Sequence, residues 1–296
     1  MIKGMILIAL TGLLWCGNGI IFSYAARKSL DFVAIMVVAT FLGAILTLAF
    51  FSKPLMIFNG TLSRTTELAI IMIGCGMIGT WGVILMQKSM RWGHHGITWI
   101  ISQSAMIFPF LVGVFMFKET VSLPKIAGLL LVVISFISFG LGQFHSTDQS
   151  AKPLIYWFPL AVFSFFILGI HQSLSLVPNH WQNWEDTANL RAMFINTGFF
   201  IGYLPSMLFH RQFPNGTTLK LSFLSAIFVV ISPITLFWSI DLMAKQKMVS
   251  LVFPLAVGIC IIAFVIYSSL FLKEKFSRIT FLGVVAGIAG LISISF

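Results

Sequence analysis

The chain has 296 residues, of which 58% are hydrophobic and only 9% are charged. Soluble domains carry about 25% charged residues, so this composition excludes a fold whose surface faces water. The net charge of +10 comes mostly from Lys and Arg at the ends of apolar runs, which is typical of membrane anchoring and not of nucleic-acid binding. The three cysteines lie inside apolar runs, and their spacing matches neither a disulfide framework nor a metal site.

Ten apolar runs of about 20 residues follow one another along the chain, and a helix of this length crosses a bilayer. The runs are continuous, whereas the strands of a membrane barrel alternate apolar and polar residues. The first run follows Lys3 without a clear small-residue cleavage site, so we interpret it as a spanning helix and not as a signal peptide. The predicted helices cover residues 5–24, 32–51, 68–88, 96–117, 124–143, 154–174, 187–209, 221–243, 249–272 and 279–296.

A motif from the middle of the chain returns near its C-terminus. The segment from Phe115 to Glu119 ends one apolar run, and Gly128 follows nine residues after the glutamate. The segment from Leu270 to Glu274 has the same design, with Gly283 nine residues on, and lies 155 residues later. Other features recur at nearly the same offset: Gly43 with Gly198, and Asn59–Thr61 with Asn215–Thr217.

This repetition predicts two halves, residues 1–143 and 154–296, joined by a polar linker over residues 144–153. Five helices in each half is an odd number, so the second half must cross the membrane in the opposite direction to the first. The predicted fold is therefore an all-α membrane protein with two inverted five-helix repeats around a central cavity, a common plan among alternating-access transporters.

Polar groups inside the predicted helices are candidates for function, because they are costly in lipid. Arg191 is either a cation that lines the cavity or an arginine at the interface that pairs with Glu185 and Asp186. His171 and Gln172, near the end of a predicted helix, either gate transport or form a hydrogen-bonded pair. The deeper amides suit neutral or zwitterionic substrates but also join helices; they are Asn18, Gln87, Gln103 and Asn196.

Tryptophans also lie within the predicted helices and not only at their ends. An aromatic-lined cavity suits flat or amphipathic substrates, although plain packing explains such residues equally well. The candidates for substrate binding are Trp15, Trp99 and Trp238.

The positions of the acidic residues and the lack of known catalytic motifs limit the possible functions. No Asp or Glu lies in the middle third of any predicted helix, which disfavours an organic-cation exporter driven by a buried acid. No Ser-His-Asp, paired-Asp or His-Glu-x-x-His arrangement is present, so we expect neither an enzyme nor a metal or cofactor site. Glu119 is expected to cap or pair at the interface, and Asp241 to pair with Lys245 one turn on.

Three motifs resemble the ten-helix drug/metabolite transporter superfamily of the EamA type. They are the Leu13–Asn18 segment, the repeated Lys-Glu pairs at 118–119 and 273–274, and Leu190-Arg191-Ala192. The resemblance implies a basket of ten helices around a cavity, with both termini in the cytoplasm. The Lys and Arg distribution leans mildly towards the other orientation, and we adopt the one that the resemblance implies.

The expected function is transport of a small organic metabolite by alternating access, with export of an amino acid or a related amphipathic metabolite as the first choice. Uptake of a sugar or nucleoside is the alternative among carriers, and a lipid-facing flippase or scaffold is the alternative from another class. We expect a monomer, with a dimer as the alternative, in the bacterial inner membrane. Its partners are then the substrate and the lipid bilayer.

Overall fold

The computed structural model describes residues 2–51, 62–93, 95–116, 118–119, 122–144, 154–181, 187–209, 214–272 and 278–294. These residues form helices and turns, with no strand among them, which confirms the predicted all-α class. The linker at 145–153, the acids Glu185 and Asp186, the Asn59–Thr61 triplet and the Lys273–Glu274 pair lie outside the described residues.

The helices follow the predicted segments closely. The first half contains α1 (Ile2–Arg27), α2 (Phe32–Leu46) with a π-helical extension (Thr47–Phe51), α4 (Leu62–Trp92), α5 (His95–Gln103), α6 (Ile107–Phe115) and α7 (Leu123–Phe144). The second half contains α8 (Leu154–Leu176) with a 3₁₀ turn (Val177–His180), α9 (Ala188–Phe209), α10 (Gly216–Ala244), a 3₁₀ turn (Val249–Leu251) with α11 (Val252–Phe271), and α12 (Arg278–Ile294).

Within the described residues, eight helical segments are long and apolar enough to cross a membrane. The two predicted helices outside this set correspond to α7 and α12, which carry shorter apolar stretches, Leu123–Ser135 and Phe281–Gly290. The chain is thus a multi-pass membrane protein.

The predicted helix over 96–117 is interrupted in its middle. A 3₁₀ turn over Ser104–Met106 separates α5 from α6. Pro109 has no N–H to donate to the carbonyl of residue 105, and a proline in a helix weakens the turn before it for this reason. The Ser104 hydroxyl donates to the Ile100 carbonyl at 2.8 Å and so satisfies one acceptor at the interruption.

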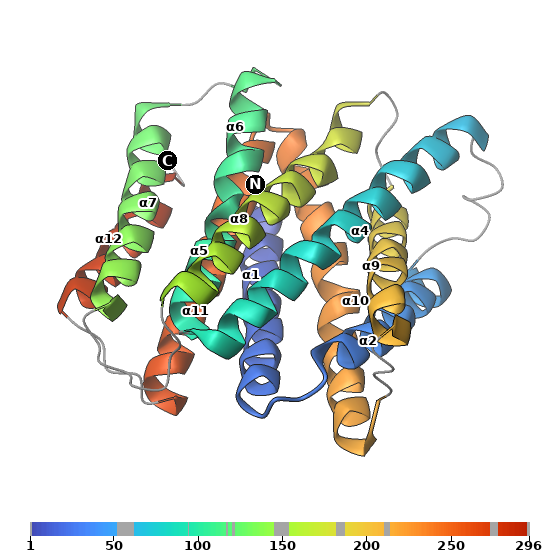
Figure 1. Ribbon diagram of the computed structural model, residues 1–296. Coiled ribbons are helices and arrows are strands. Elements are labelled where there is room, and N and C mark those ends of the chain that lie inside the picture. The colour runs from blue at the N-terminus through green and yellow to red at the C-terminus, as the bar shows by residue number, and fades with distance from the viewer. Residues whose placement is uncertain are drawn as a thin grey trace.

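The helices pack in a regular scheme. α1 lies against α10 and α11, and α8 lies against α4 and the α5–α6 segment. α2 and α9 contact each other, while α7 and α12 form a pair at one edge of the bundle (Figure 1). α6 ends at one end of the bundle and α11 at the other (Figure 1). At the end of α6, the Glu119 carboxylate accepts a hydrogen bond from the backbone N–H of Ser250, at the start of the α11 segment, at 3.0 Å.

Two glycines bring α4 and α9 into backbone contact. A Cβ atom at Gly76 would lie 2.3 Å from the carbonyl oxygen of Ile195, and one at Gly198 would lie 2.2 Å from that of Ile73. Each helix therefore uses a glycine where the other helix presents a carbonyl. Small residues allow this close approach in membranes, where helices attract one another mainly through packing.

Replacing Gly198 by alanine should destabilise the protein by about 1–3 kcal/mol, because the new methyl group overlaps the α4 backbone. Thermal unfolding in one detergent measures the effect. The matched control is Gly74→Ala, because a Cβ at Gly74 meets nothing within 4 Å, and it should leave the melting temperature unchanged or higher. Equal melting temperatures for both variants would contradict the proposed contact.

Candidate functional site

A central cavity of about 170 Å³ lies between the two halves. Side chains from α1, α2, α4 and α5 of the first half and from α8, α9, α10 and α11 of the second half line it. Among the described residues of this lining there is no Lys, Arg, Asp or Glu. The cavity is therefore built from amides, hydroxyls, one imidazole and apolar groups.

The structure brings most of the predicted site residues together in this cavity. Seven of the ten line it: Trp15, Asn18, Trp99, Gln103, His171, Gln172 and Asn196. They come from four helices, α1, α5, α8 and α9, so their grouping reflects the tertiary fold and not their order in the chain. Tyr203, which sequence reasoning missed, also lines the cavity.

Two of the amides use one end to join helices and so have defined orientations. Asn18 on α1 accepts a hydrogen bond from the Ser225 hydroxyl on α10 at 3.4 Å. Asn196 on α9 donates to the Val229 carbonyl on α10 at 3.1 Å. Each of these side chains therefore joins two helices and lines the cavity at the same time.

Two further polar groups are buried at the cavity with capacity left for a ligand. Among the described residues, the Gln172 Oε1 and the Tyr203 hydroxyl have no hydrogen-bond partner. A buried polar atom that lacks a partner destabilises the protein by about 1–3 kcal/mol. These two atoms, together with Gln103, are the best placed to bind a polar substrate.

Stacked aromatic side chains form the apolar part of the lining. Trp15 stacks on Phe253 with ring centroids 6.1 Å apart, and Trp99 stacks on Phe264 at 5.2 Å. Trp99 also meets the edge of Phe22 at 6.2 Å. The indole rings are held in place by these contacts, so the flat surfaces they offer are preformed.

His171 is held by the neighbouring helix. Its Nδ1 lies 2.8 Å from the carbonyl oxygen of Cys75 and 3.3 Å from the thiol of the same residue. Its ring packs edge-on against Phe199. One ring nitrogen is thus engaged with α4.

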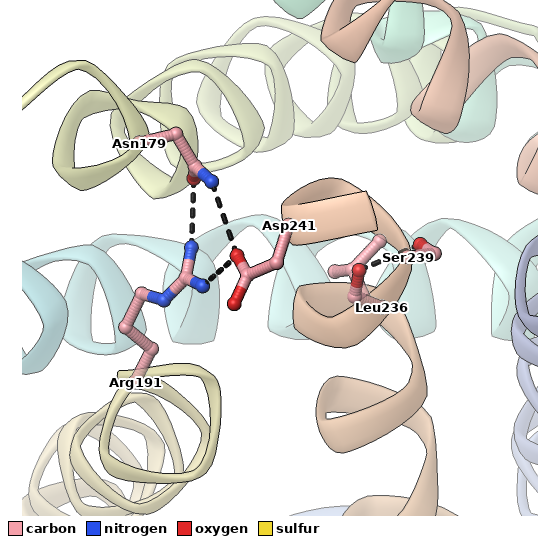
Figure 2. Close-up of polar contacts among 5 residues, drawn as sticks. All are labelled: Asn179, Arg191, Leu236, Ser239 and Asp241. Carbon is pink, nitrogen blue, oxygen red and sulfur yellow. Dashed lines mark hydrogen bonds and ion pairs between the residues drawn. The ribbon is translucent and has the colours of Figure 1, made fainter. Parts of the chain in front are cut away.

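Arg191 does not line the cavity but belongs to a buried cluster beside it (Figure 2). Its guanidinium forms an ion pair with Asp241 and donates to the Asn179 side-chain oxygen at 2.7 Å. The Asn179 amide also donates to Asp241, at 3.2 Å. The guanidinium carbon lies 4.8 Å from the centroid of Phe237, which does line the cavity.

This cluster changes the interpretation of Arg191 and Asp241. Asp241, expected from its spacing to pair with Lys245, forms its ion pair with Arg191 across helices. The Arg191 side chain is fully buried and the Asp241 side chain is 17% exposed. The cluster joins α9, α10 and the turn after α8, so the charge of Arg191 serves to hold three segments together.

Two predicted residues lie away from the cavity. Trp238 on α10 is 40% exposed and faces outwards. Gln87 on α4 is buried, but it lines a separate hollow together with Asp31 and Pro205. Each was expected in the cavity from its depth in the helix, and the helix rotation places it elsewhere.

A bundle of lipid-length helices around a central cavity is an architecture that membrane transporters use. Residues 2–141 match the model of the EamA-like transporter family, and this match places the chain in the drug/metabolite transporter superfamily, whose EamA-type members are transporters and not enzymes. No curated protein matches the chain.

Solved structures support the fold. Of the 28 chains that match, one described as "Crystal structure of protein" has a TM-score of 0.67 and 12% sequence identity, over 99% of this chain and 98% of that chain. At this level of identity the likeness extends to the fold alone.

Replacing Asp241 by leucine should destabilise the protein by about 3–5 kcal/mol, because it leaves the buried Arg191 charge without its counter-ion. The double variant Arg191→Met with Asp241→Leu should recover most of that loss, since it removes both charges together. Thermal unfolding in detergent measures both.

The exposed Lys245, one turn from Asp241, offers the matched control. The Lys245→Gln variant should have the same melting temperature as the wild type. A double variant no more stable than Asp241→Leu would show that the ion pair is not the source of the loss.

Proposed function

We propose that this transporter carries a small amphipathic metabolite that is neutral or zwitterionic, and that export of an amino acid or a related compound is its task. The observation that carries the proposal is the composition of the cavity lining: amides, hydroxyls and indole rings, with no Lys, Arg, Asp or Glu among its described residues. Amide groups both donate and accept hydrogen bonds, so they can bind the two ends of a zwitterion without a fixed charge.

The size of the cavity supports a small substrate. Sites for drug-sized ligands measure about 300–1,000 Å³, and this cavity measures about 170 Å³. Stacked indoles beside free amide groups suit a molecule with one apolar and one polar part. The same lining also favours a sugar or nucleoside, because both combine a flat face with several hydroxyls, and uptake of such a compound is the second candidate.

Alternating access is supported by the way the helices exchange partners. In the predicted repeat, α8 is the counterpart of α1, α10 of α4, and α11 of the α5–α6 segment. α1 packs on α10 and α11, while α8 packs on α4 and the α5–α6 segment, as an exchange of the two halves requires. The opposite ends reached by α6 and α11 agree with halves of opposite direction (Figure 1). Rocking of one half against the other then exposes the cavity to each side in turn.

Transport is tested by labelled amino acids, sugars and nucleosides in liposomes that contain the purified protein. Saturable exchange of one class is expected, and Gln103→Leu and Gln172→Leu should each raise the half-saturation concentration about fivefold, the effect of losing one hydrogen bond of about 1 kcal/mol. Trp238→Leu is the control, because this side chain faces outwards. No exchange above empty liposomes across the whole panel would argue against a carrier of these metabolites.

The proposed location is the bacterial inner membrane, with cytoplasmic termini. α1 and α10 run antiparallel, since Gly4 faces Met243 while Asn18 faces Ser225. The turns after these helices, with Lys28 and Lys247, therefore lie on opposite sides.

A Lys28→Cys variant should react with an impermeant maleimide added to intact cells, and Lys247→Cys should react only after the cells are opened. Background labelling should be low, because Cys16, Cys75 and Cys260 are all buried. The reverse pattern would place the termini outside the cytoplasm.

A further inference from the structure

A second hollow lies on the outer side of the bundle, apart from the central cavity. It measures about 660 Å³ and is bounded by α4, the C-terminal part of α9 and the first residues of α2. Its apolar walls face outwards, since Trp81 is 60% exposed, Met77 41% and Phe209 85%. We call it the α4–α9 groove.

One side of the groove carries a change from apolar to basic residues along α4. Met77, Trp81, Ile84, Lys88 and Arg91 follow one another at intervals of three or four residues, so they lie on one stripe of the helix. Lys88 and Arg91 are exposed at the end of the helix. Seven residues separate Trp81 from Lys88, which is about 10 Å along the axis. An exposed tryptophan below a pair of cations is the pattern of a membrane interface.

Asp31, the acidic residue described in the groove, leaves most of this positive charge available to bind a ligand. Asp31 is at the start of α2, and its Oδ1 accepts the backbone N–H of Ala34 at 3.1 Å as a helix cap. Arg91 donates to the Leu30 carbonyl, which fixes the guanidinium beside the α1–α2 turn. Among the described residues of the groove, two cations and one acid leave a net positive charge that an anion can complement.

Gln87 is the independent indication that the groove binds a polar ligand. The side chain is only 3% exposed, and neither its Nε2 nor its Oε1 has a hydrogen-bond partner among the described residues. It lies one position before Lys88 and one turn before Arg91, at the wall of the groove. An amide left without partners at membrane depth is unfavourable, and a ligand with both donors and acceptors removes this cost.

We propose that the α4–α9 groove is a binding site for an anionic phospholipid. The phosphate lies at Lys88 and Arg91, the ester and hydroxyl groups of the lipid reach Gln87, and an acyl chain follows Met77 and Trp81 along α4. A water-soluble anion would match the cations alone, whereas a lipid also covers the exposed apolar walls. This site is separate from the central cavity and does not depend on which metabolite is transported.

Native mass spectrometry of the full-length protein in detergent tests the site, with phosphatidylglycerol, phosphatidylcholine and inorganic phosphate each added alone. The wild type should retain phosphatidylglycerol in preference to phosphatidylcholine and should not retain phosphate. Removing both cations by Lys88→Gln with Arg91→Gln should weaken phosphatidylglycerol binding by more than about tenfold, since each cation near an anionic lipid contributes about fivefold.

Lys245→Gln with Lys247→Gln is the matched control, because it removes two exposed cations at the opposite end of the bundle. Gln87→Leu tests the amide separately: it should weaken phosphatidylglycerol binding while keeping or raising the melting temperature. Equal loss in the control pair, equal retention of both lipids, or unchanged binding in both groove variants would each overturn the site. Retention of inorganic phosphate with the same dependence on Lys88 and Arg91 would show an adventitious anion site in place of a lipid site.

Discussion

The fold depends on the close approach of α4 and α9 in lipid, where the hydrophobic effect does not drive helices together. Lipid tails are as apolar as the side chains of the bundle, so helices must gain contact energy by interlocking. At the crossing of α4 and α9, Gly76 and Gly198 remove side chains where the partner presents a backbone carbonyl. This contact fixes α4 and α9 relative to each other, and both helices supply walls of the central cavity and of the outer groove.

The two hollows divide the polar groups of the bundle into different tasks. The charged residues Arg191 and Asp241 neutralise each other in a cluster with Asn179. Among its described residues, the central cavity is lined by groups without a permanent charge, including the imidazole of His171. The outer groove combines the unpartnered amide of Gln87 with exposed cations at the end of α4. A buried charge without a partner is strongly destabilising, whereas a buried amide without a partner destabilises the protein much less. This difference explains why the charges pair with each other while the amides remain available to a ligand.

Much of the fold could be predicted from the sequence, because the length of an apolar run fixes where a spanning helix lies. The superfamily was predicted correctly from short motifs, and the structure places Asn18, Gln103 and Asn196, which were chosen for their depth within a helix, in the lining of the central cavity. The rotation of each helix could not be predicted. A helix surrounded by lipid and by other helices is apolar on every side, so its sequence has no polar stripe to mark the outside.

This missing stripe explains why two of the candidate residues lie away from the central cavity. Trp238 and Gln87 lie at the expected depth within their helices, but their side chains do not point into the central cavity. The ion pair of Arg191 could not be predicted, because its partner Asp241 lies 50 residues away and Asn179 lies in a turn with no distinguishing signal. The interruption between α5 and α6 had a visible cause in Pro109, but its position four residues before the proline emerged only from the structure.

The uncharged lining of the central cavity also determines how the protein responds to the voltage across its membrane. A membrane potential does work of about 2.3 kcal/mol per elementary charge for each 100 mV. Arg191 and Asp241 contribute opposite charges, and the described lining contributes no permanent charge. Passage of the proposed neutral or zwitterionic substrate by itself therefore moves no net charge across the membrane, so any response of transport to voltage would have to come from a coupled ion.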